Sequence, residues 1–220
     1  MSGFLANALV GFFGTSVVPI TGGYVSTATN TSSGTSFDFT SQAIGTAAAG
    51  RVVIVGIVND SQTVSSVSIG GVSASLVKRQ RDGTSANAEL WSAVVATGTT
   101  ATISIAFAGT TERPGIGVWA IYGASSSPSA TAGASGNAPS TTISVPAGGF
   151  AVGCIMHNTG GSSTFSWSGL TENYDAVIAS SNSHSGASSL FTAAQAPLSV
   201  TCTQSGGTNN AMALAAFAPA

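Results

Sequence analysis

Ionisable side chains are scarce in this sequence. Charged residues make up 5% of the 220 residues, whereas an ordinary soluble domain carries about 25%. Lys and Arg together number five and the net charge is −2, so the chain lacks the basic surface that binds nucleic acid or anionic membranes. Low charge also means little repulsion between copies, which favours a protein packed beside neighbours. A secreted or surface β protein with a Ser/Thr-rich exterior is the alternative.

Residues that carry chemistry are also few. Catalysis needs positioned acids, bases or nucleophiles, and no G-x-S-x-G turn or phosphate-binding Gly-rich loop occurs here. The single lysine is Lys78, and the histidines are His157 and His184. We therefore expect a protein that is not an enzyme, with no catalytic residues and no cofactor.

The pattern of metal ligands and cysteines is equally sparse. Glu172 and Asp175 offer two oxygen ligands for calcium, but two acids in a loop beside a strand are a weak signal. The histidines have no paired spacing, so we expect no metal site. Cys154 and Cys202 make no disulfide framework and are expected to be paired buried thiols, with a disulfide open in an oxidising compartment.

Two further features have competing interpretations. The only charge cluster, residues 78–82 (KRQRD), ends a strand pattern, where its charges are solvated or dock on an acidic neighbour. Trp91, Trp119 and Trp167 are expected in the core, with a sugar-stacking platform as the alternative.

The N-terminal stretch Phe4–Ile20 is apolar and uncharged. It is too short and too rich in Gly, Ser and Thr for a membrane span, and no basic segment of the kind that opens a secretory signal precedes it. We expect an assembly arm that buries itself against a partner; a core strand and a targeting or membrane segment are the alternatives. The candidate assembly residues are Phe4, Leu5, Leu9, Phe12, Phe13, Val17 and Val18.

Short strand patterns separated by turn signals follow from residue 51 onward, and they indicate a sandwich or barrel. Residues 51–58 and 115–123 are apolar on both faces and should be central strands. In residues 64–77, Gly70-Gly71 forms a two-residue hairpin turn, which sets Ile69 opposite Val72 and Ser66 opposite Ser75.

Later segments continue this pattern. In residues 150–158, Phe150, Val152, Cys154 and Met156 share one face and His157 falls on the other. Residues 124–140 are low in complexity and are expected to form a long surface loop. No tandem repeat of fixed period is visible, and the two Gly-Gly turns are too short to indicate duplication.

The expected fold is all-β. We expect a single antiparallel β-sandwich with jelly-roll-like connectivity and an extended apolar N-terminal arm, although the length also suits two small domains. Residues 1–50 would form the arm and first strand, with the first strand near residues 37–42. Residues 51–220 would form the sandwich domain.

A resemblance to a known group of proteins supports this interpretation. The succession of residues 66–77, 88–107, 115–123, 141–153 and 167–176 resembles β-rich structural proteins of tailed-bacteriophage virions, which serve as head decoration, fibre or tail-associated components. The resemblance covers residues 51–220, excludes the arm, and carries no catalytic residue to transfer.

The resemblance implies a location in the virion, assembled in the host cytoplasm. The expected function is that of a capsid decoration or cement protein docked on the head through its arm. Its partners would be the major capsid protein or tail and portal components. We expect a homo-oligomer, with a trimer as one candidate, and neither nucleic acid nor membrane as a partner. A tail or head fibre domain that recognises the host is the alternative within the virion, and a carbohydrate-binding or adhesin module is the alternative outside it.

Overall fold

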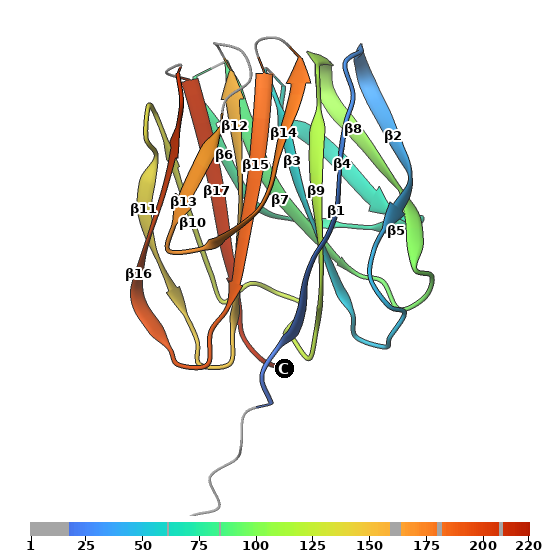
Figure 1. Cartoon of the computed structure of the whole chain (residues 1–220). Coiled ribbons are helices and arrows are strands. Elements are labelled where there is room, and N and C mark those ends of the chain that lie inside the picture. Colours follow the sequence, from blue (N-terminus) through green and yellow to red (C-terminus); the bar gives the residue numbers. More distant parts are fainter. Residues whose placement is uncertain (1–17, 61, 84, 159–163, 180–181, 207–208) are drawn as a thin grey trace, which may run out of the picture.

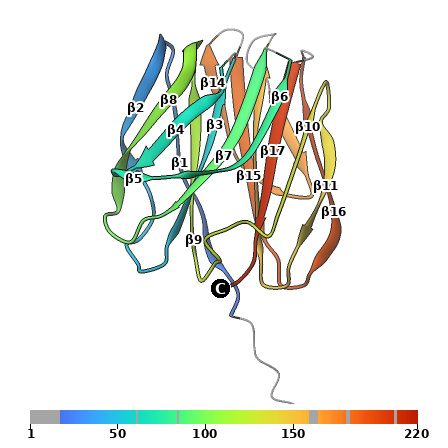
Figure 2. The same ribbon diagram turned by 180° about the vertical axis from the view of Figure 1, so that it is seen from behind.

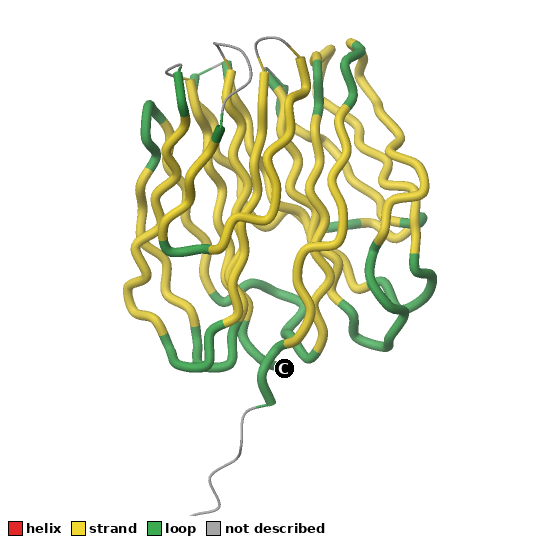
Figure 3. The backbone as a smooth tube through the Cα atoms, in the orientation of Figure 1, coloured by secondary structure: helices red, strands yellow, loops and turns green. Residues whose placement is uncertain are grey.

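The computed structural model describes residues 18–60, 62–83, 85–158, 164–179, 182–206 and 209–220. Within them the chain is all-β with antiparallel pairing throughout and no helix, which confirms the expected class. Most of its strands run along the length of the molecule, and most of the connections lie at its two ends (Figure 3).

The described residues form nine strands in the first half of the chain and eight in the second. The first nine are β1 (Thr21–Thr29), β2 (Ser33–Ala43), β3 (Val52–Asn59), β4 (Val64–Ile69), β5 (Val72–Ser73), β6 (Ser75–Asp82), β7 (Ala86–Val94), β8 (Thr100–Glu112) and β9 (Gly115–Tyr122). The others are β10 (Ala130–Ser135), β11 (Ser140–Val145), β12 (Phe150–Asn158), β13 (Phe165–Ser168), β14 (Thr171–Ala179), β15 (Asn182–Leu190), β16 (Gln195–Gln204) and β17 (Asn209–Phe217).

Each half forms its own two-layer sandwich, so the expectation of a single sandwich is wrong. The first half has the sheets β1-β9-β3-β7-β6 and β2-β8-β4-β5, and the second has β10-β17-β12-β15-β14 and β11-β16-β13. The two five-stranded sheets face each other in the middle of the molecule, and the smaller sheets lie outside them (Figures 1 and 2). Four layers therefore enclose three apolar cores.

The two halves share one strand order. The large sheet of the first half has the order β1-β9-β3-β7-β6, and the large sheet of the second half has the equivalent order β10-β17-β12-β15-β14. In the small sheets, β2-β8-β4 corresponds to β11-β16-β13. The middle core takes residues from both large sheets, including Trp119 and Leu90 from the first half and Phe150 and Phe217 from the second. The chain thus contains a structural duplication that its sequence does not display.

The central strands agree with the sequence patterns. Both β3 and β9 are buried on both faces, as predicted. Phe150, Val152, Cys154 and Met156 of β12 lie in the middle core, while His157 faces Phe165 in the outer core of the second half.

The predicted hairpin forms but ends early. Ile69 pairs with Val72 and Ser68 with Ser73 around Gly70-Gly71. Ser75 does not pair with Ser66; it pairs with Ser92 of β7 in the other sheet. The chain leaves the small sheet at Ala74 and enters the large sheet. There β6 becomes the edge strand and pairs with β7, with Leu76 opposite Trp91 and Lys78 opposite Leu90.

Two strands occur where none was expected. Residues 130–135, predicted to be loop, form the edge strand β10 beside β17. Large side chains are missing there because β10 lies close to β6: a Cβ on Gly133 would lie 2.7 Å from Oε1 of Gln80. β1 lies in the Gly/Ser/Thr-rich stretch and pairs with β9.

The expected domain boundary at residue 51 falls inside the first half. Strands β1 and β2, which precede it, belong to the same two sheets as β3 to β9.

Both ends of the described chain lie at one end of the molecule (Figures 1 and 2). Val18 is 73% exposed, whereas Ile20 is buried and its amide donates to the Gly148 carbonyl. Near the C-terminus the Ala220 amide donates to the carbonyl of Gly123. Of the candidate assembly residues, Phe4, Leu5, Leu9, Phe12, Phe13 and Val17 lie outside the described residues.

Candidate functional site

Both histidines are completely buried. His157 Nδ1 lies 2.8 Å from Oδ1 of Asn210, the residue opposite it on β17. Asn210 is itself fixed by two hydrogen bonds. Its side-chain Nδ2 donates to the Gly136 carbonyl, and its backbone N–H donates to the Asp82 carboxylate. A histidine without access to solvent has no route to a substrate, so this network positions strands.

His184 lies between the two halves. Its Nδ1 is 3.4 Å from the Tyr174 hydroxyl, and its Nε2 would lie 2.7 Å from a Cβ at Gly115 of β9. Burial lowers the pKa of His184 to about 3, because the charged ring would lose its hydration. The ring is therefore neutral at ordinary pH and is part of the middle core.

The charge cluster 78–82 is largely used inside the fold. Arg79 makes a bidentate ion pair with Glu89, which is fully buried. Asp82 accepts a hydrogen bond from the Asn210 amide and so links β6 to β17. The expectation that these charges are simply solvated is wrong for Arg79 and Asp82; whether the cluster docks on a neighbour stays a prediction.

The cysteines are buried, as expected, but they are not paired. Cys154 lies in the middle core and Cys202 in the outer core of the second half, and both are free thiols. Burial is the main cause that raises the pKa of each thiol well above its usual range. Neither thiol is positioned to act as a nucleophile.

The tryptophans confirm the core interpretation. Trp91 and Trp119 are buried, and Trp167 packs against the outer core with its Nε1 2.8 Å from the Ser185 hydroxyl oxygen.

The acids of residues 171–176 do not gather a metal-binding group. Asp175 accepts a hydrogen bond from the Phe165 amide. Partial burial, together with the nearby Asp175 charge, raises the pKa of Glu172. Across the described part of the chain, no group of three or more metal-ligating side chains forms.

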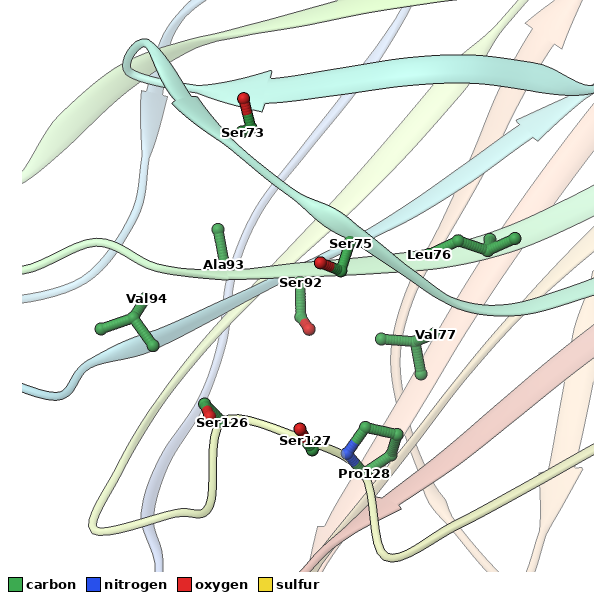
Figure 4. Close-up of a pocket in the computed structure, with 10 residues that line it drawn as sticks. All are labelled: Ser73, Ser75, Leu76, Val77, Ser92, Ala93, Val94, Ser126, Ser127 and Pro128. Atoms are coloured by element: carbon green, nitrogen blue, oxygen red, sulfur yellow. The ribbon is translucent and has the colours of Figure 1, made fainter.

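A groove on the first half is the first candidate site (Figure 4). It has a volume of about 340 Å³ and lies between the β5–β6 crossover, the end of β7 and the segment that joins the halves. No charged side chain lines it. The lining residues are Ser73, Ser75, Leu76, Val77, Ser92, Ala93, Val94, Ser126, Ser127 and Pro128.

The groove offers both apolar surface and a strand edge. Leu76 and Val94 are each 43% exposed. The pairing of β6 with β7 begins at Ser75 and Ser92, so on that side Ala93 and Val94 pair with no strand of the described residues. An extended uncharged segment can add to such an edge.

The second half carries a counterpart of this groove. In β6–β7 the register passes from Ser75↔Ser92 to a bulge at residue 77, and in β14–β15 it passes from Thr171↔Ser188 to a bulge at residue 173. Val77 and Asn173 therefore hold equivalent positions. The second groove, about 360 Å³, is lined by Gly22, Gly23, Tyr24, Phe150, Thr171, Asn173, Ser188, Ser189 and Leu190.

The equivalent grooves differ in chemistry. The first has aliphatic residues at the bulge and at its rim, whereas the second has the amide of Asn173 and the phenol of Tyr24. Sequence reasoning missed both residues, because Tyr24 lies in a stretch without other large side chains and Asn173 lies between two acids. The stacking of the two halves brings them together.

Comparisons with models of protein families, with curated proteins and with solved structures found no match. The described residues include no helix long and apolar enough to cross a membrane.

Proposed function

We propose that this protein is a non-enzymatic structural protein of a tailed-phage virion, a decoration or cement protein of the head. The observation that carries the proposal is the placement of Val18. It is exposed at the end of the molecule that also holds the C-terminus, and it directly follows the apolar stretch of the sequence that contains the other candidate assembly residues. That end would dock on the particle and the opposite end would face away.

The chemistry of the described residues supports a role in assembly. The histidines and cysteines are buried, and Glu89 and Arg51 are fully enclosed by hydrogen-bonding partners. Apolar area that is covered on docking contributes about 25 cal/mol per Å² before the costs of association. Because the protein carries few charges, electrostatic repulsion opposes this docking only weakly.

We also propose that each half is jelly-roll-like. Of its eight main strands, the first, last, third and sixth are neighbours in the large sheet, and the second, seventh and fourth are neighbours in the small sheet, as expected for two interlocked Greek keys. In the first half the strand before β7 is divided, with β5 in the small sheet and β6 in the large one.

The proposed partners are other virion proteins, either the major capsid protein or tail and portal components, and further copies of this chain. A homo-oligomer, with a trimer as one candidate, would use the groove of Figure 4, which is uncharged and lies beside the segment joining the halves. The location would be the virion, after assembly in the host cytoplasm.

A fibre domain for host recognition is the second candidate. It is favoured by the end opposite the termini, where the described connections from β1 to β2, from β8 to β9 and from β10 to β11 lie (Figure 1). Copy number separates the two: a decoration protein is present in many copies per particle, a fibre in few.

Deletion of residues 1–17 tests the docking proposal. The deletion must stop there because Ile20 is in the middle core and β1 begins at Thr21. The shortened protein should fold and remain soluble but fail to join particles that lack the native protein. Deletion of residues 1–3, which removes no candidate assembly residue, is the matched control. Normal incorporation of the protein without residues 1–17 would overturn the proposal.

A further inference from the structure

The second groove lies on the seam between the two halves. One wall is the edge strand β1 with Gly22, Gly23 and Tyr24, and the other is β14 and the end of β15. Both edge strands have a β-bulge here, at residue 25 beside Tyr24 and at residue 173. Bulges at sheet edges re-aim side chains and are frequent beside binding sites.

The Asn173 amide is fixed in one orientation. Its Oδ1 accepts hydrogen bonds from Trp119 Nε1 and from the Ser188 hydroxyl, both at 2.8 Å. Trp119 is fully buried in the opposite half, so it orients the amide from the core side. Nδ2 makes no hydrogen bond to any described residue, which leaves a positioned donor at the groove.

Tyr24 adds an aromatic ring and a hydroxyl. The ring stacks on Tyr174 with centroids 5.3 Å apart and meets Trp119 edge-on. Its hydroxyl has no partner among the described residues, and partial burial raises the pKa of Tyr24. The phenol thus stays neutral, as a rigid apolar surface with a polar tip.

The remaining wall supplies hydroxyls and bare backbone. Ser189 accepts a hydrogen bond from the Thr171 amide and donates to the Thr171 hydroxyl. Gly22 has φ of 98°, and a Cβ there would clash with the Ala120 carbonyl, so this wall must stay free of a side chain. Leu190, 49% exposed, forms an apolar rim.

The groove offers no charged group to an ionic ligand. None of its lining residues is ionised at neutral pH, and Glu172, which lies between the lining residues Thr171 and Asn173 in the sequence, disfavours anions. A volume of about 360 Å³ is at the small end of ligand sites. An aromatic surface, a fixed amide donor and several hydroxyls suit a small neutral molecule with many hydroxyl groups.

We propose that this seam groove binds one residue of a neutral saccharide, with Asn173 Nδ2 as the orienting donor and Tyr24 as the ring contact. The first groove lacks these features, since its bulge residue is Val77 and no aromatic side chain lines it. The proposal is independent of particle docking, because none of its residues lies in the N-terminal arm.

The test uses the full chain on an array of neutral and sialylated glycans, followed by NMR titration with the methyl glycosides of glucose, galactose, mannose and N-acetylglucosamine. We expect binding of a neutral glycan, with chemical-shift changes at Tyr24, Asn173 and Ser188. The array reports glycans as they occur on cell surfaces, and the glycosides report a free sugar.

Two substitutions keep the local structure while removing the proposed contacts. Asn173→Asp retains both acceptor sites for Trp119 and Ser188 but loses the donor, and Tyr24→Phe keeps the ring but loses the hydroxyl. Each should weaken binding about tenfold, equivalent to about 1.4 kcal/mol, while Ser127→Ala in the first groove should leave it unchanged. Absence of neutral glycan binding, preference for sialylated glycans, or full binding by the doubly substituted protein would each overturn the proposal. Particle incorporation of the doubly substituted protein should be normal, which separates this result from the docking test.

Discussion

Arg79 and Glu89 form a two-point ion pair across adjacent strands β6 and β7. Nε of Arg79 lies 2.8 Å from Oε1 and Nη2 lies 3.0 Å from Oε2 of the carboxylate. Glu89 has no exposed surface. Its oxygens also accept hydrogen bonds from the Val64 amide, Asn87 Nδ2 and Trp91 Nε1, each at 2.9 Å. One buried carboxylate thus joins three strands of the first sandwich, β4, β6 and β7.

Removing one partner of this pair should be strongly destabilising. Arg79→Met leaves an uncompensated buried carboxylate, for which a cost of about 3 kcal/mol is expected. The free energy of unfolding, from urea titration followed by tryptophan fluorescence, measures the loss. Arg79→Met combined with Glu89→Gln should recover part of the stability, because the buried charge is gone. A single Arg79→Met variant as stable as the native protein would contradict this account.

The stability of the fold should fall in mild acid because of His184. Its pKa is about 3 in the folded protein and near 6.5 when unfolded, so between these values the unfolded chain binds the extra proton. Stability is therefore complete above pH 6.5 and declines as the pH falls toward 3. The expected loss from this residue between pH 6.5 and pH 5 is about 2 kcal/mol.

The variant His184→Asn isolates that contribution. Asn does not titrate, so the pH dependence of its unfolding free energy between pH 5 and 7 should be flatter than that of the native protein. Carboxylates contribute equally to both proteins in this range. Identical slopes would show that His184 is hydrated or charged in the folded state.

The alternation of apolar and polar residues along the strands made much of this fold predictable. The Gly70-Gly71 turn and the opposite faces of Cys154 and His157 follow from a period of two residues and from turn chemistry. These features depend on neighbours in sequence, so no tertiary information is required.

The features that sequence did not predict depend on distant neighbours. β10 consists of small residues because β6 of the other half lies against it, and no local pattern records that contact. Arg51 reads as an ordinary charged residue before a strand, yet it is fully buried and donates to the carbonyls of Gly45, Val95, Thr97 and Gly98. The duplication lies in strand order and register alone.

The candidate site was hidden for the same reason. Asn173 acquires its orientation from a bulge and from Trp119, which lies 54 positions earlier in the chain. A sequence pattern shows neither. Trp119, one of the three tryptophans for which sugar stacking was the alternative to a core position, supports the groove from the core and does not face it.

The close approach of the halves should make Gly186 intolerant of a side chain. A Cβ at this position would lie 2.7 Å from Cζ2 of Trp119 and would also meet Tyr174, and both rings are held by the middle core. Gly186→Ala should cost about 2 kcal/mol through overpacking. Gly34→Ala is the control, since its Cβ would lie 3.4 Å from Phe37 at ordinary contact distance. Equal melting temperatures for the two variants would contradict the tight packing at Gly186.

The two cysteines should be protected from thiol reagents by folding. Burial holds the pKa of Cys154 and Cys202 well above the usual range, so little thiolate forms. Labelling with a chromogenic disulfide at pH 8 should be slow in the native protein and should release two equivalents in guanidinium chloride. Rapid labelling of one thiol without denaturant would show that its core opens locally.

The shared middle core should hold the halves together after the chain is cut. A protease site inserted between Ser126 and Ser127 lies in the segment joining β9 to β10, outside the strands. After cleavage, size-exclusion chromatography should show one species of unchanged size, because separation would expose the apolar faces that carry Trp119 and Phe150. Each half refolded alone should aggregate, and mixing the unfolded halves before refolding should restore the soluble species. Two separate soluble halves would show instead that each sandwich is stable alone and that the middle core is an ordinary domain contact.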